Sequence, residues 1–203
     1  MKPRPERGGC TAAFSLVEML IVMALIVTMW VMTYGSRQAK YQRVQKQHCQ
    51  ENLQKMYIAL QLYANDFNGL TPAMTNATTS EAVLSVLVPR YMADTTVFIC
   101  PGGRDSQFPS GASLKQEKIS YAYYMGRQLG SATEALMSDR QVNTNRKTQG
   151  AELFSATGEP PGNNHKKYGG NVMFSDGHID NSKPAAAFPL DYPDTVTLLN
   201  PKP

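Results

Sequence analysis

The sequence predicts an α+β fold in which one long N-terminal helix precedes a smaller region of short strands and loops. Residues 14–67 contain no proline, and apolar side chains within that stretch recur at helical spacing. The chain after residue 69 alternates short extended stretches with turn residues, as small antiparallel sheets do. A chain of 203 residues has room for one domain plus an anchor.

Residues 14–34 form the longest apolar stretch, and Glu18 is its one strongly polar side chain. A helix of this length measures about 31 Å, which matches the hydrocarbon core of a bilayer. Small residues precede the stretch, and no signal-peptidase pattern follows it, so a retained anchor is favoured over a cleaved secretory signal. Basic residues flank the stretch on both sides, so their charge does not fix its orientation.

Glu18 requires an explanation because an ionised carboxylate inside a membrane costs about 2.5–3.5 kcal/mol. An acidic residue in such a place is therefore a functional hypothesis. The alternative is that Glu18, near one end of the segment, reaches the lipid headgroups.

A second helical segment is expected over residues 36–68. Its apolar side chains recur on one face, which predicts packing against a domain core. This stripe comprises Leu53, Met56, Tyr57, Leu60, Tyr63, Ala64 and Phe67. Asn68-Gly69, followed by Pro72, predicts the end of the helix.

The region 69–203 contains weaker local signals. A short helix capped by Thr79 or Ser80 should run to about Val88 and end at Pro89. Strands are expected near residues 98–100, 119–124 and 136–138. Asp176-Gly177 lies between two extended stretches and predicts a hairpin with a type I′ turn. Prolines predict an irregular tail; they are Pro184, Pro189 and Pro193.

The three cysteines are split by the apolar stretch, with Cys10 before it and Cys49 and Cys100 after it. An even pair on one side suits a disulfide in an oxidising compartment. Two free buried thiols are the alternative.

Few residues suggest catalysis or metal binding. His165, Asp176, His178 and Asp180 could form a divalent-metal set, since imidazole and carboxylate are common ligands. Asp176 already has a turn role, however, and polar residues on a hairpin need no special cause. The sequence contains no H-E-x-x-H, G-x-S-x-G or phosphate-loop motif. We therefore predict that the protein is not an enzyme. The formal net charge of +4 is scattered, which argues against a nucleic-acid partner.

The stretch AFSLVEMLIVMALIV, residues 13–27, resembles the N-terminal signature of type IV pilins and type II secretion pseudopilins. The resemblance implies cleavage by prepilin peptidase between Ala13 and Phe14 and N-methylation of Phe14. Glu18 would then be the fifth mature residue and would pair with the N-terminus of a neighbouring subunit during assembly. The family usually has glycine before the cut, where this chain has Ala13.

The resemblance also implies an organisation of the chain. Residues 1–13 would be a cytoplasmic leader, and residues 14–35 a transmembrane helix that becomes the filament core. Residues 36–68 would be an amphipathic stalk, packed in the pilin-like manner on a small antiparallel sheet with an irregular C-terminal region. Residues 69–203 would form a periplasmic α+β region, anchored by a single span in the bacterial inner membrane.

The C-terminal part resembles a large bacterial group of pilin-like proteins, in blocks such as FICPGG, ISYAYYMG, ALMSDR and NHKKYGGNVMFSDGHID. Cys49 and Cys100 lie at the two cysteine positions of that group, which implies that they form a disulfide. Major pseudopilins often hold a structural calcium ion, for which the candidate ligands here are Asp176 and Asp180, with Asn164 and Asp191. The resemblance implies no other cofactor.

These observations together predict a non-enzymatic filament subunit. Its expected partners are other pilin-like subunits, prepilin peptidase, the inner-membrane assembly platform and the membrane itself. The alternative function is that of a membrane-anchored periplasmic hydrolase or ligand-binding domain that uses the region 165–180.

Overall fold

The computed structural model of the protein describes residues 15–108 and 113–203. It confirms the α+β class, with one long helix and a five-stranded antiparallel sheet. The chain divides into two compact units, with the boundary between Lys40 and Tyr41. This boundary lies a few residues beyond the predicted start of the stalk segment. Gln42, just after it, is the first buried residue among those of the helix whose burial is described.

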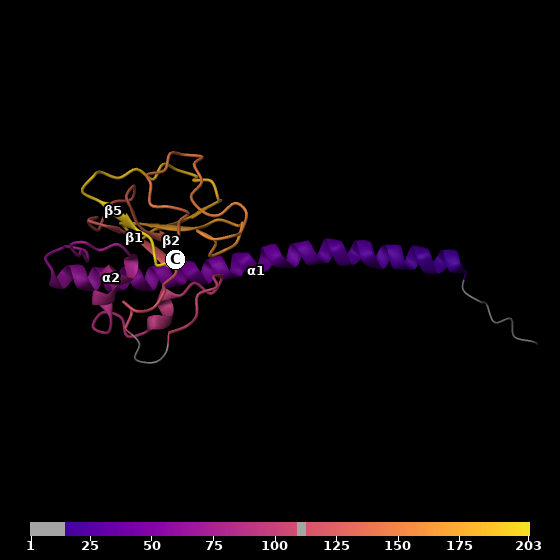
Figure 1. The fold of residues 1–203 in the computed structure, drawn as a ribbon, viewed down its shortest axis with the longest axis horizontal. Helices are drawn as coiled ribbons and strands as arrows, with labels where there is room; N and C mark the ends of the chain where they lie inside the picture. Colours follow the sequence, from indigo (N-terminus) through magenta and orange to yellow (C-terminus); the bar gives the residue numbers. More distant parts are fainter. Residues whose placement is uncertain (1–14, 109–112) are drawn as a thin grey trace, which may run out of the picture. The chain divides into compact units, whose positions relative to one another are not determined.

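Helix α1 (Leu16–Asp66) is the predicted long helix, and Figure 1 shows it near the N-terminal end of the chain. Its first half exposes apolar side chains throughout, as at Leu20 and Trp30, which are 62% and 65% exposed. The described residues include one helix that is long and apolar enough to cross a membrane, by length and composition, and it is α1. The single-pass anchor predicted from the sequence is therefore compatible with the structure.

The second half of α1 packs in the core of the second unit. The predicted stripe is buried at Leu53, Met56, Leu60 and Ala64, whereas Phe67 is 44% exposed. At the end of the helix, the backbone N–H of Gly69 donates to Ala64 O (2.7 Å), and Asn68 and Gly69 have positive φ angles of 54° and 83°. This is the left-handed termination that Asn68-Gly69 predicted.

The sheet contains β1 (Tyr121–Met125), β2 (Ala135–Asp139), β3 (Gly170–Phe174), β4 (Ile179–Ser182) and β5 (Thr197–Leu199). Their order is β4-β3-β2-β1-β5, and every pairing is antiparallel. The strands predicted at 119–124 and 136–138 correspond to β1 and β2. Strand β5 was not predicted; it follows the prolines of the tail and pairs with β1.

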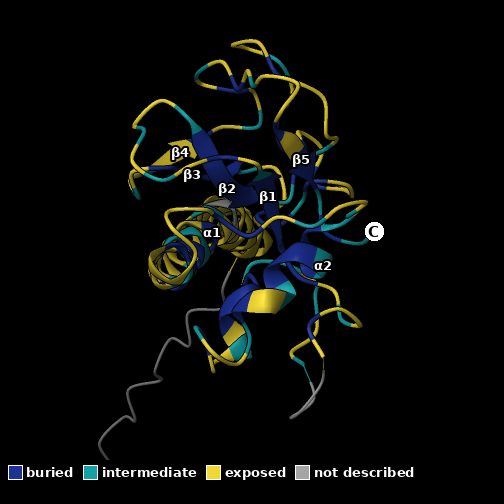
Figure 2. Cartoon of the chain, turned by 90° about the vertical axis from the view of Figure 1, so that its left-hand side faces the viewer, coloured by how far each residue is buried: buried dark blue, intermediate teal, exposed yellow. Residues whose placement is uncertain are grey.

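The sheet is covered on both faces, and Figure 2 shows its central strands as buried. One face packs on α1 and on the helices α2 (Ser80–Leu84), η1 (Ser85–Leu87) and η2 (Thr95–Phe98). The other face packs on the loops of the C-terminal half. Successive residues of a strand point to opposite faces, so Tyr121 and Tyr123 join the first cluster, and Ala122 and Tyr124 the second. Helices α2 and η1 confirm the short helix predicted before Pro89.

The strand predicted at 98–100 is wrong. Residues 95–98 form the 3₁₀ helix η2 instead, because the Asp94 side chain accepts hydrogen bonds from Thr96 N (3.0 Å) and Thr96 Oγ1 (2.6 Å) and caps it. A single backbone hydrogen bond, from Ser120 N to Phe98 O (2.9 Å), connects this segment to the residue that precedes β1.

The predicted hairpin is present between β3 and β4, but its turn is not type I′. A type I′ turn needs positive φ at both central residues, and at this turn only Gly177 has one (93°). Gly177 N donates to Phe174 O (3.0 Å), and Phe174 N donates to His178 O (2.9 Å). The loop therefore has three residues, with Gly177 as the left-handed residue at its end.

Gly169, just before β3, has a φ of +79°, and a Cβ atom there would lie 2.0 Å from Ser182 O. We expect Gly169→Ala to lower the free energy of unfolding by at least about 2 kcal/mol, since overpacking adds to the cost of the left-handed backbone. Urea denaturation of the full chain in detergent measures this change. Gly150→Ala is the matched control: its φ is +85°, and a Cβ would meet nothing within 4 Å. Equal losses in the two variants would contradict the steric explanation.

Candidate functional site

The residues expected to be processed, Ala13 and Phe14, lie outside the described residues. Glu18 lies in the first turn of α1, where its carboxylate Oε2 accepts a hydrogen bond from Ser15 N (3.0 Å). This is how the acidic residue of a capping box satisfies a free N–H group at the start of a helix. Glu18 therefore has a local partner within its own chain, which the Ser15-x-x-Glu18 pattern could have predicted.

The two threonine side chains of the apolar segment find hydrogen-bond acceptors within the helix. The Thr28 hydroxyl donates to Leu25 O (2.9 Å), and the Thr33 hydroxyl donates to Met29 O (3.0 Å). These side chains therefore add no unsatisfied donor to the surface of the helix. Glu18 remains the one acidic group on the described part of this segment, residues 15–34.

The second candidate site is a disulfide bond. Cys49, on α1, and Cys100, in the loop after η2, form a disulfide, which is the pairing that the resemblance implied. Their Cα atoms are 5.4 Å apart, and they lie 51 positions apart in the sequence. Both cysteines are buried. The disulfide ties α1 to the segment that leads into the sheet.

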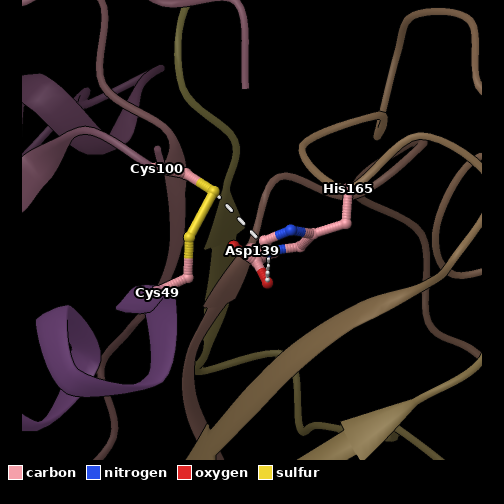
Figure 3. Close-up of side chains that lie close together, drawn as sticks. All are labelled: Cys49, Cys100, Asp139 and His165. Atoms are coloured by element: carbon pink, nitrogen blue, oxygen red, sulfur yellow. Dashed lines mark hydrogen bonds and ion pairs between the residues drawn. A yellow bond between two sulfur atoms is a disulfide. The ribbon is translucent and has the colours of Figure 1, made fainter. Parts of the chain in front are cut away.

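A buried histidine–carboxylate pair lies against this disulfide (Figure 3). His165 Nε2 is 3.2 Å from Asp139 Oδ2 and 3.5 Å from Cys100 Sγ, and neither His165 nor Asp139 is exposed. Asp139 ends β2, and His165 lies in the loop before β3. Gly102 leaves room for the imidazole, because a Cβ at that position would lie 2.7 Å from His165 Nδ1.

Hydrogen bonds fix the Asp139 carboxylate. Asn171 N donates to Oδ2 (2.7 Å), and Asn164 Nδ2 donates to Oδ1 (3.1 Å). Burial by itself would raise the pKa of Asp139, but the positive charge of His165 and these hydrogen bonds outweigh it and lower the pKa. Lys46 lies nearby: burial lowers the pKa of its ammonium, and the charge of Asp139 opposes that shift.

Asp139 was not among the site residues predicted from the sequence. It is the last residue of β2, ALMSD, whose other side chains are apolar or small and whose residues are all buried. A buried carboxylate at the end of such a strand needs a partner in the core. The position of Asp139 in the sequence could therefore have marked it as a residue that needs a partner. The sequence could not have identified that partner, because His165 comes from a loop that no local pattern places beside β2.

The structure does not assemble the predicted set of His165, Asp176, His178 and Asp180 into one site. His165 contacts Asp139 and Cys100, whereas His178 contacts Asp176 through its Nδ1 and stacks on the Phe174 ring. Asp180 is exposed on β4. His165, in the Gly-rich segment, is therefore a residue of the core, whereas His178 contacts the residues of the hairpin turn.

The calcium candidates also lie in separate environments. Asp176 accepts a hydrogen bond from His178 N (3.0 Å), and the Asn164 amide donates to Ser120 O (2.6 Å) as well as to Asp139. Asp191 lies 3.7 Å from Arg146 Nε. Each of the three thus has a protein partner.

A polar cleft of about 590 Å³ lies between the loop at 104–106 and the loop at 160–164. Its lining includes Arg104, Lys118 and Arg140. The inner cation, Arg140, already forms an ion pair with Asp105 (3.0 Å) and donates to Ile119 O (2.7 Å). The Arg140 guanidinium is therefore already engaged by groups of the protein itself.

Comparisons of the chain with protein-family models, with curated proteins and with solved structures give no match.

Proposed function

We propose that the protein is a structural subunit of a filament of the type IV pilin or type II secretion pseudopilin kind. The observation that carries this proposal is the place of Glu18. It is a carboxylate in the first turn of a helix that exposes apolar side chains along its N-terminal half and is long and apolar enough to cross a membrane. A charge at that place is costly in lipid, so a neighbouring subunit with an opposite charge is a reason to keep it.

Each part of the chain has a role in such a filament. Cleavage after Ala13 would create a free amine at Phe14, and the Glu18 carboxylate of another subunit would pair with it. The pair would mainly set the register between packed helices, because desolvation offsets much of its Coulomb energy. The second half of α1, packed on an antiparallel sheet, is the arrangement expected of a pilin-like stalk and head.

Assembly of such a filament also needs a processing enzyme and an assembly machine. Prepilin peptidase would trim and methylate the precursor, and an inner-membrane assembly platform driven by a cytoplasmic ATPase would extract the subunit. The region after residue 69 would face the periplasm. Asp176 and Asp180 remain the candidate ligands should this region hold a structural calcium ion. We propose no hydrolase function, because His165 is fully buried and therefore out of reach of a substrate.

Glu18 has two roles to separate, since it caps its own helix as well as offering a charge to a neighbour. Glu18→Gln keeps an acceptor for Ser15 N, because glutamine also serves at this position of a capping box, but removes the charge. Glu18→Ala removes both. We expect both variants to lower the yield of sedimentable filaments at least about tenfold, because the loss of one partner of a buried ion pair is strongly destabilising.

The experiment co-expresses the full chain with a prepilin peptidase and an assembly platform. Intact-mass and N-terminal sequencing should show a chain that begins at Phe14 and is heavier by one methyl group, in the unaltered protein and in both variants. If Glu18→Gln assembles normally while Glu18→Ala does not, capping explains Glu18 and the intersubunit pair is wrong. A chain that still begins at Met1 beside an active peptidase would overturn the filament proposal itself.

A further inference from the structure

Four side chains that can bind a metal ion meet in the core of the second unit. Cys49, Cys100, Asp139 and His165 are all buried, and their ligand atoms lie within 4.8 Å of one another. They come from four separate segments: α1, the loop after η2, the end of β2 and the loop before β3 (Figure 3). Within residues 15–108 and 113–203, this is the one cluster of three or more such groups.

The donor atoms of this cluster suit zinc. Two sulfurs, one imidazole nitrogen and one carboxylate oxygen are the ligand types of tetrahedral zinc sites. Thiolate ligands favour zinc over magnesium or calcium, which prefer oxygen. A disulfide sulfur is not such a ligand, because it is the thiolate that binds the metal. The site can therefore exist only when the Cys49–Cys100 bond is reduced.

We propose that the reduced protein binds one zinc ion through Cys49, Cys100, Asp139 and His165, so that zinc and the disulfide are alternative cross-links of the same core. This inference is independent of the filament function. It assigns to the His165–Asp139 pair a role that packing beside a disulfide does not require.

Reduction of the disulfide precedes binding of the metal. A dithiol reductant gives two electrons and two protons to the Cys49–Cys100 bond and becomes a disulfide itself. Zinc then replaces the two thiol protons and the proton that the charged His165 imidazole holds on Nε2, and all three protons are released to solvent. The imidazole coordinates through Nε2 and keeps its other ring proton on Nδ1. Zinc thus takes the place between Nε2 and Asp139 that a proton occupies in the oxidised protein.

The required movement is small. Two sulfur ligands of a tetrahedral zinc ion lie about 3.8 Å apart, since each Zn–S bond is about 2.3 Å. The Cα atoms of the two cysteines are 5.4 Å apart, so rotation of the side chains can open this gap without moving α1. The Asp139 carboxylate is already oriented by Asn171 and Asn164, as the outer shell of a metal site orients its ligands.

The local charge also suits a dication. Two thiolates and one carboxylate would leave the zinc site with one net negative charge. Lys46 is the nearby cation: its Nζ donates to Tyr168 O (3.3 Å) and Ser182 O (3.5 Å), and it interacts electrostatically with Asp139. The ammonium can therefore balance the excess charge of the loaded site.

The test uses the full chain in detergent micelles, with Cys10→Ser in every sample so that Cys49 and Cys100 supply all thiols. After reduction with a phosphine and removal of excess metal, elemental analysis should find one zinc ion per reduced chain and none per oxidised chain. Cobalt in place of zinc should give the thiolate charge-transfer absorption of a tetrahedral site with two sulfur ligands. The cobalt spectrum needs no core mutation, so a variant that fails to fold does not decide the outcome.

Variants then identify the other two ligands. Asp139→Asn and His165→Ala should each weaken zinc binding at least about tenfold, because even outer-shell losses cost that much. His178→Ala is the matched control, since His178 pairs with Asp176 at the surface and should leave binding unchanged. The proposal is overturned if the reduced chain takes up no zinc, if the oxidised chain binds it equally, or if the reduced chain unfolded in urea binds it as tightly.

Discussion

Removing the disulfide should lower the free energy of unfolding of the second unit by about 4 kcal/mol. The bond closes a loop over a sequence separation of 51 residues, and in the chain-entropy model a loop of this length restricts the unfolded state by about that amount. Cys49→Ala and Cys100→Ala, singly and together, are measured by urea denaturation with EDTA present. The near-ultraviolet circular dichroism of the buried tyrosines of β1 reports on the core.

The double variant should lose little more than either single variant, since the first substitution already opens the loop. Cys10→Ala is the matched control, because it removes a thiol without removing a cross-link. A loss below about 1 kcal/mol in Cys100→Ala would contradict the loop-closure explanation. A loss that grows with both substitutions would instead point to the packing of each side chain.

Asp139→Ala should cost about 3–5 kcal/mol of unfolding free energy, the range found when one member of a buried ion pair is removed. The substitution leaves the His165 charge uncompensated and leaves the Asn171 N–H without its acceptor. His165→Ala added to Asp139→Ala should restore part of the loss, because it removes the unpaired charge. Urea denaturation of the four proteins forms a double-mutant cycle.

The pH dependence of the unfolding free energy tests the contribution of the same pair independently. The pKa of Asp139 is lowered in the folded protein from its ordinary value of 3.8. The stabilisation is therefore complete well above that value and is lost as the pH falls below it, through the folded pKa. The Asp139→Ala variant should lose less stability than the unaltered chain as the pH falls below about 4.

The surface pair His178–Asp176 provides the contrast for the buried one. It has the same chemical groups, but His178 is 40% and Asp176 33% exposed. Exposed ion pairs contribute little because water screens them. His178→Ala should accordingly change the unfolding free energy much less than Asp139→Ala. Equal losses would mean that burial does not set the strength of these pairs.

Local signals account for the parts of the fold that could be predicted from the sequence. The long helix follows from periodicity and from the absence of proline between residues 14 and 67, and its end follows from Asn68-Gly69. The β3–β4 hairpin follows from Asp176-Gly177, although the loop length that decides its turn type is not visible in two residues. Each of these features depends on neighbours within a few positions.

The features that could not be predicted depend on distant residues. Strand β5 has three residues and forms because it pairs with the edge of β1. The segment 98–100 has a strand-like composition, yet Asp94 caps a 3₁₀ helix there. Asp139 and His165 meet only once β2 and the loop before β3 are in place. The capping role of Glu18 was local, however, and the Ser15-x-x-Glu18 pattern was sufficient to predict it.

The disulfide has a mechanical consequence. A pulling force applied to the N-terminal half of α1 reaches Cys49 and can pass through the sulfur bond to Cys100, so the chain between them lies outside the load-bearing path. The end of α1, α2 and η2 belong to that sheltered stretch. Under tension, the oxidised protein should extend by about 170 Å less than the reduced one, since about 50 residues at about 3.4 Å each stay behind the bond. Force on the helix is thus transmitted through the disulfide towards the strands and bypasses the C-terminal turns of the helix.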